Sequence, residues 1–545
     1  MAHTALKTLT LLAAAGAVLA QLPASVQDQK NITLEDGRTV RFKESNLCET
    51  TEGVKSYAGY VDIANDKHIF FWFFESRSDP ANDPITLWLN GGPGADSMGG
   101  LFDEIGPCKI NEDYATTELN PHSWNEVSNL LFLSQPVGVG FSYGSKLETE
   151  APINGAGTII APARLSVADY AAVNSTEIAS DDAWNVMKMF YAALPEMAPE
   201  VKSKTFHMAT QSYGGHWGPT FFNRFRKETQ ALEDNAPFEV GALMIVNGIT
   251  DFGLQYPSFP KFAMHNTHGV HVNGMIAAYM DFSLIMENYG CLALVDLCEQ
   301  WWDLTNGTTI YGLSRCQAAV EVCRNTVESP FLAYTKRHAY DVRNSTVDPG
   351  EYHLPDARYT PYLNVPEVQQ ALGVDLNYTG AVNIEYVGSF GYTGDFVNPK
   401  LLKDLEELLD SQVRVSLWYG DADWVCNWFG GEMLALGTNY TNAEKFGAAG
   451  YAPLMVDNTH YGDTREFGNF AFTRIFDAGH AMPFYQPEAA FAMFNRVING
   501  KDTATGEHDL KHDYSTTGPS ESTYSQMKEK TKRSLQGSAK FRNRL

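Results

Sequence analysis

The chain has 545 residues, of which 44% are hydrophobic, 12% aromatic and only 19% charged, a globular composition that one large domain can accommodate. Its 65 acidic residues outnumber 40 basic ones and give a formal net charge of −25, which argues against binding to nucleic acid or to an anionic membrane surface. The composition therefore predicts a globular protein with an acidic, solvated surface.

The first twenty residues predict a secretory signal peptide. Lys7 supplies a positive charge, Leu9 to Ala20 form a short apolar run, and Ala20 provides the small residue that signal peptidase requires. A membrane anchor is the alternative interpretation, but an anchor needs an apolar run of about twenty residues. We therefore expect a secreted protein, extracellular or vacuolar, with no membrane partner.

Sequons and cysteines agree with secretion. Behind a signal peptide, six N-x-Ser/Thr sequons predict a glycoprotein and mark expected surface positions: Asn31, Asn174, Asn306, Asn344, Asn377 and Asn439. An oxidising compartment would pair six of the seven cysteines, and the disulfide candidates are Cys48, Cys108, Cys291, Cys298, Cys316 and Cys323. For the last four we favour a nested pairing, Cys291 with Cys323 and Cys298 with Cys316. A zinc site is the alternative, disfavoured because the spacing lacks C-x-x-C pairs.

Strand and helix patterns alternate along most of the chain. The apolar runs predict strands at 68–74, 85–89, 129–133, 205–209, 240–246, 413–418 and 473–476. Helical spacing predicts helices at 181–194, stopped by Pro195, at 213–227 and at 489–498. This alternation predicts an α/β fold with a mostly parallel central sheet and helices on both faces.

Two regions break the alternation. Residues 256–393 hold the four clustered cysteines and a Tyr/Pro-rich stretch, and we interpret them as an inserted helical cap over the active-site edge. From Lys511 the chain turns polar and then basic, which predicts a disordered tail over 511–545. The expected organisation is a signal peptide at 1–20, one domain at 21–510 and the tail.

The stretch around Ser212 has the form of a nucleophile elbow. An apolar strand runs into Ser212, and Gly214 and Gly215 lead directly into a helix, as a sharp turn that exposes the hydroxyl requires. The N-terminus of that helix favours negative charge and would help to stabilise an oxyanion. The G-x-S-x-G pattern is incomplete, because Thr210 replaces its first glycine.

Two later strand ends supply partners for this serine. The strand at 413–418 leads to Asp423, and the strand at 473–476 leads to His480. Taken singly, an Asp/Gly turn and a surface histidine are simpler interpretations. The joint order Ser, Asp, His is that of α/β-hydrolases. His480 would accept the proton of Ser212, and Asp423 would fix the tautomer of the imidazole and balance its charge.

A third motif, Trp88-Leu-Asn-Gly-Gly-Pro-Gly94, could complete the site. Here a strand runs into Asn90, Gly91 and Gly92, whose backbone N–H groups would be exposed beside the serine as an oxyanion hole requires. An ordinary Gly/Pro turn is the alternative interpretation.

Together these motifs, with Gly-Asp-x-Asp-x-x-Cys-Asn and Ala-Gly-His, resemble the serine carboxypeptidase family over residues 45–500, and its fungal carboxypeptidase S1-like branch in particular. The resemblance implies the α/β-hydrolase fold and a triad of Ser212, Asp423 and His480. It also implies an oxyanion hole of the Gly92 and Tyr213 N–H groups, a binding site for the substrate carboxylate at Trp88, Asn90, Gly91, Glu104 and Gln211, and a cysteine outside the disulfides near the triad, Cys426.

The chain also departs from the family pattern. Thr210-Gln211 replaces Gly-Glu, and in the family that glutamate shares a proton with the acid at Glu104. Because Gln211 cannot ionise, we expect carboxylate binding that depends less on acidity. Ala95 replaces a disulfide cysteine and Ser134 replaces an acid, while Ala481-Met482 replaces Met-Val in the pocket for the leaving residue.

The sequence therefore predicts a secreted serine carboxypeptidase that hydrolyses C-terminal peptide bonds through an acyl-enzyme. Its expected partners are peptides and proteins with free C-termini, and no cofactor or metal is implied. A serine carboxypeptidase-like acyltransferase on small-molecule substrates is the alternative, since an alcohol or amine can intercept an acyl-enzyme. A third class, a non-catalytic glycoprotein, would make no use of the triad.

Overall fold

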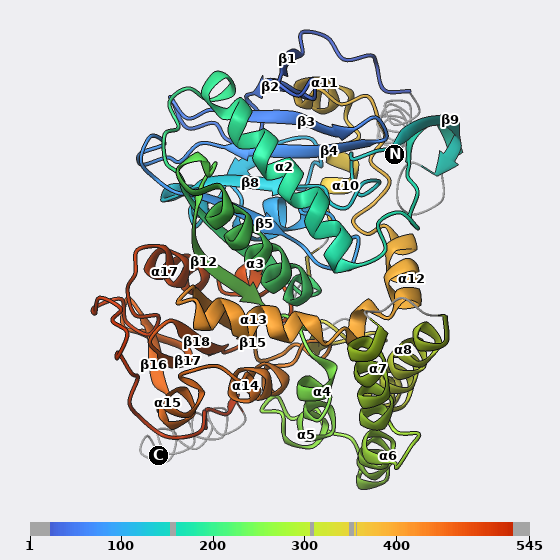
Figure 1. Ribbon diagram of the computed structural model, residues 1–545, viewed down its shortest axis with the longest axis vertical. Coiled ribbons are helices and arrows are strands. Elements are labelled where there is room, and N and C mark those ends of the chain that lie inside the picture. The colour runs from blue at the N-terminus through green and yellow to red at the C-terminus, as the bar shows by residue number, and fades with distance from the viewer. Residues whose placement is uncertain (1–21, 153–159, 306–309, 348–353, 356, 527–545) are drawn as a thin grey trace, which may run out of the picture. The chain divides into compact units, whose positions relative to one another are not determined.

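The computed structural model describes residues 22–152, 160–305, 310–347, 354–355 and 357–526 (Figure 1). These fall into two compact units. The first comprises Met1–Met244, Pro355–Thr393 and Ala490–Ile498, and the second comprises Ile245–Leu354, Gly394–Ala489 and Asn499–Leu545. The predicted signal peptide lies outside the described residues.

The first unit is built on strands in the order β1-β2-β3-β4-β8-β5-β11-β12. The outer strands β1 to β4 are antiparallel, and β8, β5 and β11 are parallel to one another. This arrangement is mixed rather than mostly parallel as predicted, because short turns such as the one between β3 and β4 can join only antiparallel strands. The bounds are β1 (Lys30–Thr33), β2 (Thr39–Ser45), β3 (Ser56–Ala64), β4 (Lys67–Phe74), β5 (Ile85–Leu89), β8 (Asn129–Leu133), β11 (Thr205–Gln211) and β12 (Glu239–Val246).

The central strands of this unit are buried along their whole length. Every residue of β5 and β8 is buried, in agreement with the continuous apolar runs from which both were predicted. Smaller pairs lie outside the main sheet of this unit: β6 (Cys108–Ile110) with β7 (Thr117–Leu119), and β9 (Ser145–Pro152) with β10 (Ile160–Val167).

Helices pack on these strands. In Figure 1, α2 (Thr176–Met197) and α3 (Gly214–Leu232) cross the near side of the first unit. Pro195 does not stop α2 as predicted, since the helix continues to Met197. A proline this close to the helix end removes one hydrogen bond only, so the last turn persists. The other helical segments are η1 (Gly100–Ile105), η2 (Trp124–Glu126), η3 (Glu233–Asn235), α10 (Tyr359–Tyr362), α11 (Pro366–Leu372) and α12 (Ile384–Thr393).

The second unit has strands in the order β15-β18-β17-β16. Here β15 and β18 are parallel, whereas β18, β17 and β16 are antiparallel neighbours joined by short turns. The bounds are β15 (Arg414–Gly420), β16 (Ala452–Val456), β17 (Thr459–Phe467) and β18 (Phe470–Ile475), with a separate pair of β13 (Arg337–His338) and β14 (Asp341–Ser345).

Most of the second unit outside these strands is helical. Its helical segments are α4 (Phe252–Gln255), α5 (Ser258–His265), α6 (Gly274–Ile285), α7 (Cys291–Thr305), α8 (Ile310–Val322), η4 (Cys323–Glu328), α9 (Ser329–Thr335), η5 (Asp395–Val397), α13 (Lys400–Asp410), α14 (Trp428–Gly437), α15 (Ala443–Ala448) and α16 (Met482–Tyr485). Helix α17 (Pro487–Ile498) begins in this unit and ends in the first.

The described residues contain three disulfides. Cys291–Cys323 and Cys298–Cys316 confirm the nested pairing and join α7 to η4 and to α8. In the first unit, Cys48–Cys108 closes a loop of 60 residues. Cys426 is buried and takes part in no disulfide.

The chain beyond Lys511 differs from the disordered tail that its polar composition predicts. Thr516 donates to the Gly450 carbonyl, Tyr524 stacks on Phe476 with 3.9 Å between ring centroids, and Gln526 donates to Asp421 at 2.8 Å. Backbone and side-chain hydrogen bonds to other segments of the second unit thus order 511–526 without an apolar segment. The rest of the predicted tail, 527–545, lies outside the described residues.

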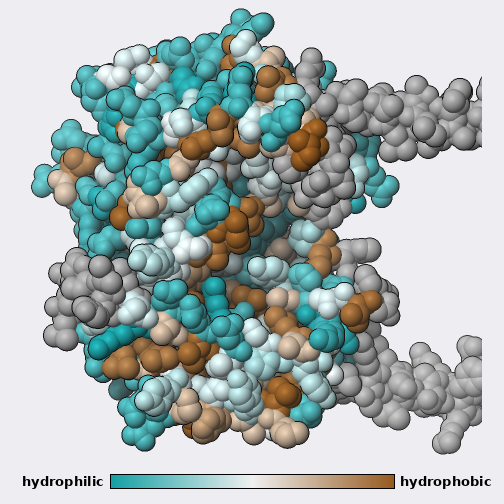
Figure 2. Space-filling model, turned by 90° about the vertical axis from the view of Figure 1, so that its right-hand side faces the viewer, coloured by the Kyte–Doolittle hydropathy of each residue, from teal (hydrophilic) through white to brown (hydrophobic). Residues whose placement is uncertain are grey.

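The face drawn in Figure 2 is mostly hydrophilic, with hydrophobic residues scattered over it, as the composition predicts. Among the described residues, no helix combines the length and the apolar character that a membrane-spanning segment requires.

Candidate active site

Ser212 lies at a strained turn between β11 and α3. Its φ of 65° is in the left-handed region, which is unfavourable for a residue with a side chain. The turn is tight: a Cβ on Gly91 would lie 2.3 Å from the Tyr213 nitrogen, and a Cβ on Gly214 would lie 2.6 Å from the Thr210 side chain. The structure therefore has the elbow that the sequence predicts, with Thr210 in place of the first glycine.

Parallel pairing brings the loop after β5 to this elbow. Thr210 on β11 is paired with Leu89 on β5, so both strands end at the same edge. Gly91 approaches the elbow so closely that no side chain would fit there, and Gly92 follows with a φ of 103°. The two backbone segments predicted to form an oxyanion hole are therefore adjacent in the first unit.

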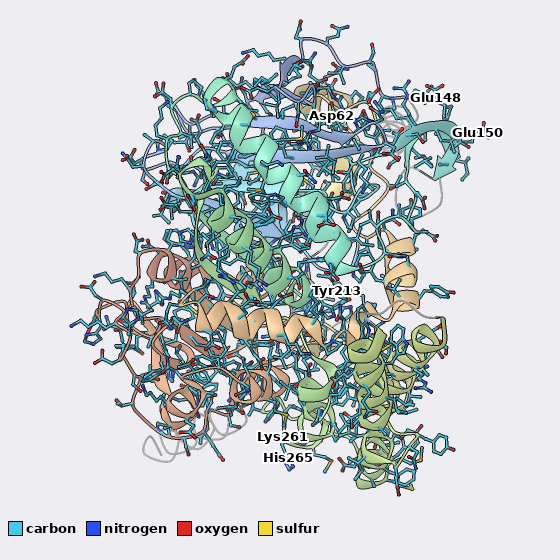
Figure 3. All side chains as sticks on the ribbon, in the orientation of Figure 1. Asp62, Glu148, Glu150, Tyr213, Lys261 and His265 are labelled. Atoms are coloured by element: carbon cyan, nitrogen blue, oxygen red, sulfur yellow. A yellow bond between two sulfur atoms is a disulfide. The ribbon has the colours of Figure 1, made fainter. Side chains whose placement is uncertain are left out.

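Tyr213 begins the turn into α3 (Figure 3). Its side chain is buried, and its ring stacks on His216 with 3.9 Å between ring centroids and packs edge-on to Trp217. These contacts hold Tyr213 in place at the start of the helix, and its backbone N–H is one of the two predicted oxyanion-hole donors. A helix N-terminus stabilises negative charge, which is the property an oxyanion hole needs.

A chain of hydrogen bonds runs through the residues predicted to bind the substrate carboxylate. The Asn90 Oδ1 accepts from the Trp88 indole at 2.8 Å and from the backbone N–H of Gly100 at 3.0 Å. The Asn90 Nδ2 then donates to Gln211 Oε1 at 2.9 Å, and Gln211 Nε2 donates to Glu104 Oε2 at 2.7 Å. Because each amide has its oxygen occupied, the orientation of both side-chain amides is defined.

Glu104 is buried at the end of this chain. The pKa of its carboxyl is raised from 4.5 to about 8, mainly by burial and also by the charge of Asp103, and against the lowering effect of the hydrogen bonds from Gln211 and Asn90. The carboxyl therefore holds its proton in acid and at neutral pH. A neutral carboxylic acid donates a hydrogen bond, so this group can face a carboxylate without repelling it.

In the second unit, two parallel strands end side by side and carry the predicted acid and base. Gly420 of β15 is paired with Ile475 of β18, so the loops that follow them share one edge. Asp423, fully buried, lies with its Oδ2 2.6 Å from the Nδ1 of His480. Such a pair fixes one tautomer of the imidazole and leaves Nε2 as the atom that can accept a proton.

Two further residues support this pair and were not predicted. Asn247 donates from Nδ2 to Asp423 Oδ2 at 3.0 Å, and its own Oδ1 accepts from Gly420 N at 3.0 Å. Tyr340 accepts from the His480 backbone N–H at 2.9 Å, and its ring lies 4.8 Å from the imidazole. Asn247 directly follows the predicted strand at 240–246. A polar residue at the end of a strand is the one feature of the sequence that could have indicated its role.

Cys426 lies near the pair. Potential ligand atoms of Asp423, Cys426 and His480 lie within 4.8 Å of one another. This donor set could coordinate a transition metal. Coordination would, however, occupy the same two side chains whose hydrogen bond prepares the imidazole to accept a proton.

The six sequons differ in exposure. Asn31 and Asn439 are exposed, Asn174 is half-buried, and Asn306 lies outside the described residues. Asn344 and Asn377 differ from the surface positions predicted, because they are only 4% and 5% exposed. The amide of Asn377 accepts from the Arg164 backbone N–H at 2.9 Å and so forms part of the fold. A sequon specifies what the glycosylating enzyme can bind, and it does not specify burial.

Comparison with known proteins agrees with the geometry. Residues 47–500 match the sequence model of the serine carboxypeptidase family. Carboxypeptidase S1 homolog B from Arthroderma otae is 37% identical, over 94% of this chain and 85% of that protein. Carboxypeptidase S1 from Penicillium janthinellum is 33% identical, over 84% of this chain and 98% of that protein.

A solved structure shares the fold. The crystal structure of Kex1(delta)p, a prohormone-processing carboxypeptidase from Saccharomyces cerevisiae, matches with a TM-score of 0.61 and 19% identity, over 85% of this chain and 94% of that chain. At this identity the match shows the fold alone. The fold is that of the α/β-hydrolases, as the sequence predicts, although its large sheet is mixed rather than mostly parallel.

Proposed function

Because the chain belongs to the serine carboxypeptidase family, we propose that it removes single residues from the C-termini of peptides and proteins. The observation that carries the proposal is the hydrogen-bonded chain Asn90–Gln211–Glu104, which lies directly beside the elbow of Ser212. A neutral acid and two oriented amides next to a nucleophile suit a substrate whose scissile bond is close to a free carboxylate.

In the proposed reaction, the Nε2 of His480 accepts the proton of Ser212 as Oγ attacks the last peptide carbonyl. The tetrahedral oxyanion accepts from the N–H groups of Gly92 and Tyr213. His480 then protonates the leaving amine, which departs as a free amino acid and leaves an acyl-enzyme. Water, deprotonated by the same histidine, hydrolyses the ester. Asp423 holds the imidazole in the required tautomer and stabilises its positive charge.

The carboxylate site accounts for cleavage at the end of the chain only. We propose that the substrate carboxylate binds among Asn90, Gly91, Glu104 and Gln211, with Trp88 fixing the Asn90 amide. Glu104 would donate its proton to the substrate carboxylate, and an internal peptide bond would have no group for this site. A C-terminal amide removes the negative charge and should react poorly for the same reason.

Secretion and glycosylation belong to the same proposal. The predicted signal peptide and three disulfides fit an extracellular or vacuolar protein, since disulfides persist in oxidising compartments. Among the sequons that the structure describes, Asn31 and Asn439 are the best placed for glycans, because both side chains are exposed.

The test is product analysis on purified protein with blocked dipeptides, in the absence and in the presence of an added alcohol or amine. Release of one free amino acid per turnover, lost in Ser212→Ala, supports the hydrolase. Products dominated by transfer to the added nucleophile at low concentration would favour the alternative acyltransferase instead. Labelling of Ser212 by a fluorophosphonate without any turnover of peptides would contradict the proposed substrate class.

A further inference from the structure

Another buried carboxylate, Asp96, lies in the loop that carries Gly92. Its Oδ1 accepts from the Ser134 hydroxyl at 2.8 Å, and its Oδ2 accepts from the Tyr378 hydroxyl at 2.7 Å. Asp96, Ser134 and Tyr378 are all 2% exposed or less. Three segments far apart in the sequence therefore meet at one carboxyl group, within the first unit.

The Asp96 side chain and backbone are closely packed against other segments of the chain. A Cβ added at Gly140 would lie 2.2 Å from the Asp96 Oδ2, so the backbone at 140 packs directly against the carboxylate. The backbone N–H of Asp96 also donates to the Ala381 carbonyl at 2.8 Å. Both the side chain and the backbone of Asp96 are thus tied to segments outside its own loop.

Hydrogen bonds within the loop connect Asp96 to the proposed oxyanion hole. Ala95 donates its backbone N–H to the Gly91 carbonyl at 3.1 Å, and Asn90 donates its own to Ser97 Oγ at 3.4 Å. The loop from Asn90 to Ser97 is therefore closed on itself on either side of Asp96. Because these hydrogen bonds hold the loop together, a shift of Asp96 would also displace Gly92.

We propose that Asp96, Ser134 and Tyr378 form an anchor that positions the oxyanion-hole loop. This anchor holds a loop that has no disulfide, because Ala95 stands where the family pattern has a disulfide cysteine. The anchor is a non-covalent clamp, with two hydroxyl donors and one carboxylate acceptor. It rests on the proposed function in one respect, the role of the Gly92 N–H as an oxyanion-hole donor. Asp96 is a positioning residue, since it contacts neither the nucleophile nor the predicted carboxylate site.

The geometry also makes the carboxyl and hydroxyl exchangeable. The two side chains face each other across a single 2.8 Å contact, so a carboxylate at position 134 and a hydroxyl at 96 would keep the same pair in the same space. The departure at Ser134 then has a physical explanation: the acid of this contact is supplied from the opposite side. A carboxylate at both positions would be a buried like-charge pair, and a hydroxyl at both would leave Tyr378 with no carboxylate to donate to, only the weaker acceptor of a hydroxyl oxygen.

The experiment is a double-mutant cycle of Asp96→Ser, Ser134→Asp and the double exchange, performed on the full chain. Two quantities are measured for each variant: the melting temperature, and the second-order rate of Ser212 labelling by a fluorophosphonate. We expect each single variant to label at least 10-fold more slowly than wild type, and the double exchange to recover to within about 3-fold. Additive effects would give a loss of at least 100-fold, so this recovery corresponds to a coupling of at least about 2 kcal/mol. A double exchange as slow as the product of the two single effects would overturn the proposal.

Two additional variants keep the test decisive. If Asp96→Ser does not fold, Asp96→Asn replaces it in the same cycle, because an amide at 96 can donate to a carboxylate at 134. As a control for general destabilisation, Phe190→Ala removes a fully buried ring of α2 that packs edge-on against Phe71 and Phe73 of β4. It should lower the melting temperature as much as a single variant and leave labelling at 25 °C within 2-fold of wild type. An equal loss of labelling in this control would overturn the positioning role.

The readouts separate this proposal from the proposed function. Normal labelling of wild-type Ser212 without release of amino acids would contradict the carboxypeptidase, while the cycle would still decide the anchor. Absence of labelling in wild type would overturn both the nucleophile and the positioning role.

Discussion

Replacing Gln211 by Glu should convert a binding site that is indifferent to acidity into one that requires it. In the wild-type protein, Gln211 Nε2 lies 2.7 Å from Glu104 Oε2. A glutamate at 211 would place two carboxyl groups at this distance in a buried site. Two such groups share one proton and lose the other in the acid range, so the pair would carry a charge of −1 near neutrality.

The size of the effect follows from the charge that the substrate carboxylate meets. Burial holds the pKa of Glu104 at about 8, so the wild-type site is neutral from pH 4 to 7. In Gln211→Glu the single negative charge would face the substrate carboxylate at about 4 Å, which costs about 4 kcal/mol at an effective dielectric constant of 20. If neighbouring amides and solvent offset half or more of this, KM should rise between pH 4 and 7 by roughly 10- to 30-fold.

The assay is KM and kcat for a blocked dipeptide at several pH values from 4 to 9. Wild type should give a KM that is flat to about pH 7 and rises as Glu104 loses its proton near pH 8. Gln230→Glu, which adds the same charge on the exposed side of α3, should behave as wild type. A wild-type KM that rises between pH 4 and 6, or a Gln211→Glu KM that stays flat from pH 4 to 7, would refute this reasoning.

The raised pKa of Glu104 also makes the stability of the protein depend on pH. Because the pKa of Glu104 is raised from 4.5 to about 8 in the folded state, its contribution to the free energy of unfolding is complete below pH 4.5 and is lost as the pH rises through 8. Glu104→Gln should remove this dependence, so its melting temperature should fall less than that of wild type between pH 6 and 9. An equal fall in both proteins would contradict the assignment.

Three further predictions concern other residues. Asp423→Asn should lower kcat by about 10⁴-fold with little change in KM, since it leaves the imidazole in the wrong tautomer; steady-state kinetics would show it, and a loss below 10-fold would contradict the proposed role. Ser212→Gly and Ser212→Ala should both be inactive, but Gly should be more stable by about 1 kcal/mol because it accepts a φ of 65° without strain, so equal resistance to denaturant would count against a strained elbow. Peptide mapping of secreted protein should find glycans at Asn31 and Asn439 and none at Asn377, whose buried amide is part of the fold; a glycan there in active protein would show that the local packing differs.

The parts of the site that were predictable from the sequence lie next to strand ends. Ser212, Asp423 and His480 each follow an apolar strand, and a short strand pattern is decided by residues close together in the chain. Parallel pairing then fixes which loops meet, so the neighbours of Gln211 follow from the register of β11 with β5. For these residues local pattern and tertiary structure agree.

The parts that were not predictable depend on contacts between distant segments. Asp96 meets Tyr378 across 282 residues, and Gln526 meets Asp421 across 105, so neither contact leaves a local pattern. The burial of Asn377 arises in the same way, from its bond to the backbone of Arg164. Composition predicted a disordered tail because 511–545 contains few apolar residues. Residues 511–526 are instead held by hydrogen bonds and one stacked ring.

The most direct test of the account compares one peptide in two forms, with a free C-terminal carboxylate and with a C-terminal amide, at pH 6. We expect release of the last residue from the free acid and a kcat/KM at least 100-fold lower for the amide, since the amide carries no charge for Asn90, Gln211 and Glu104 to bind. Similar rates for both forms, or cleavage at internal bonds, would contradict the claim that this array confines the reaction to the C-terminus.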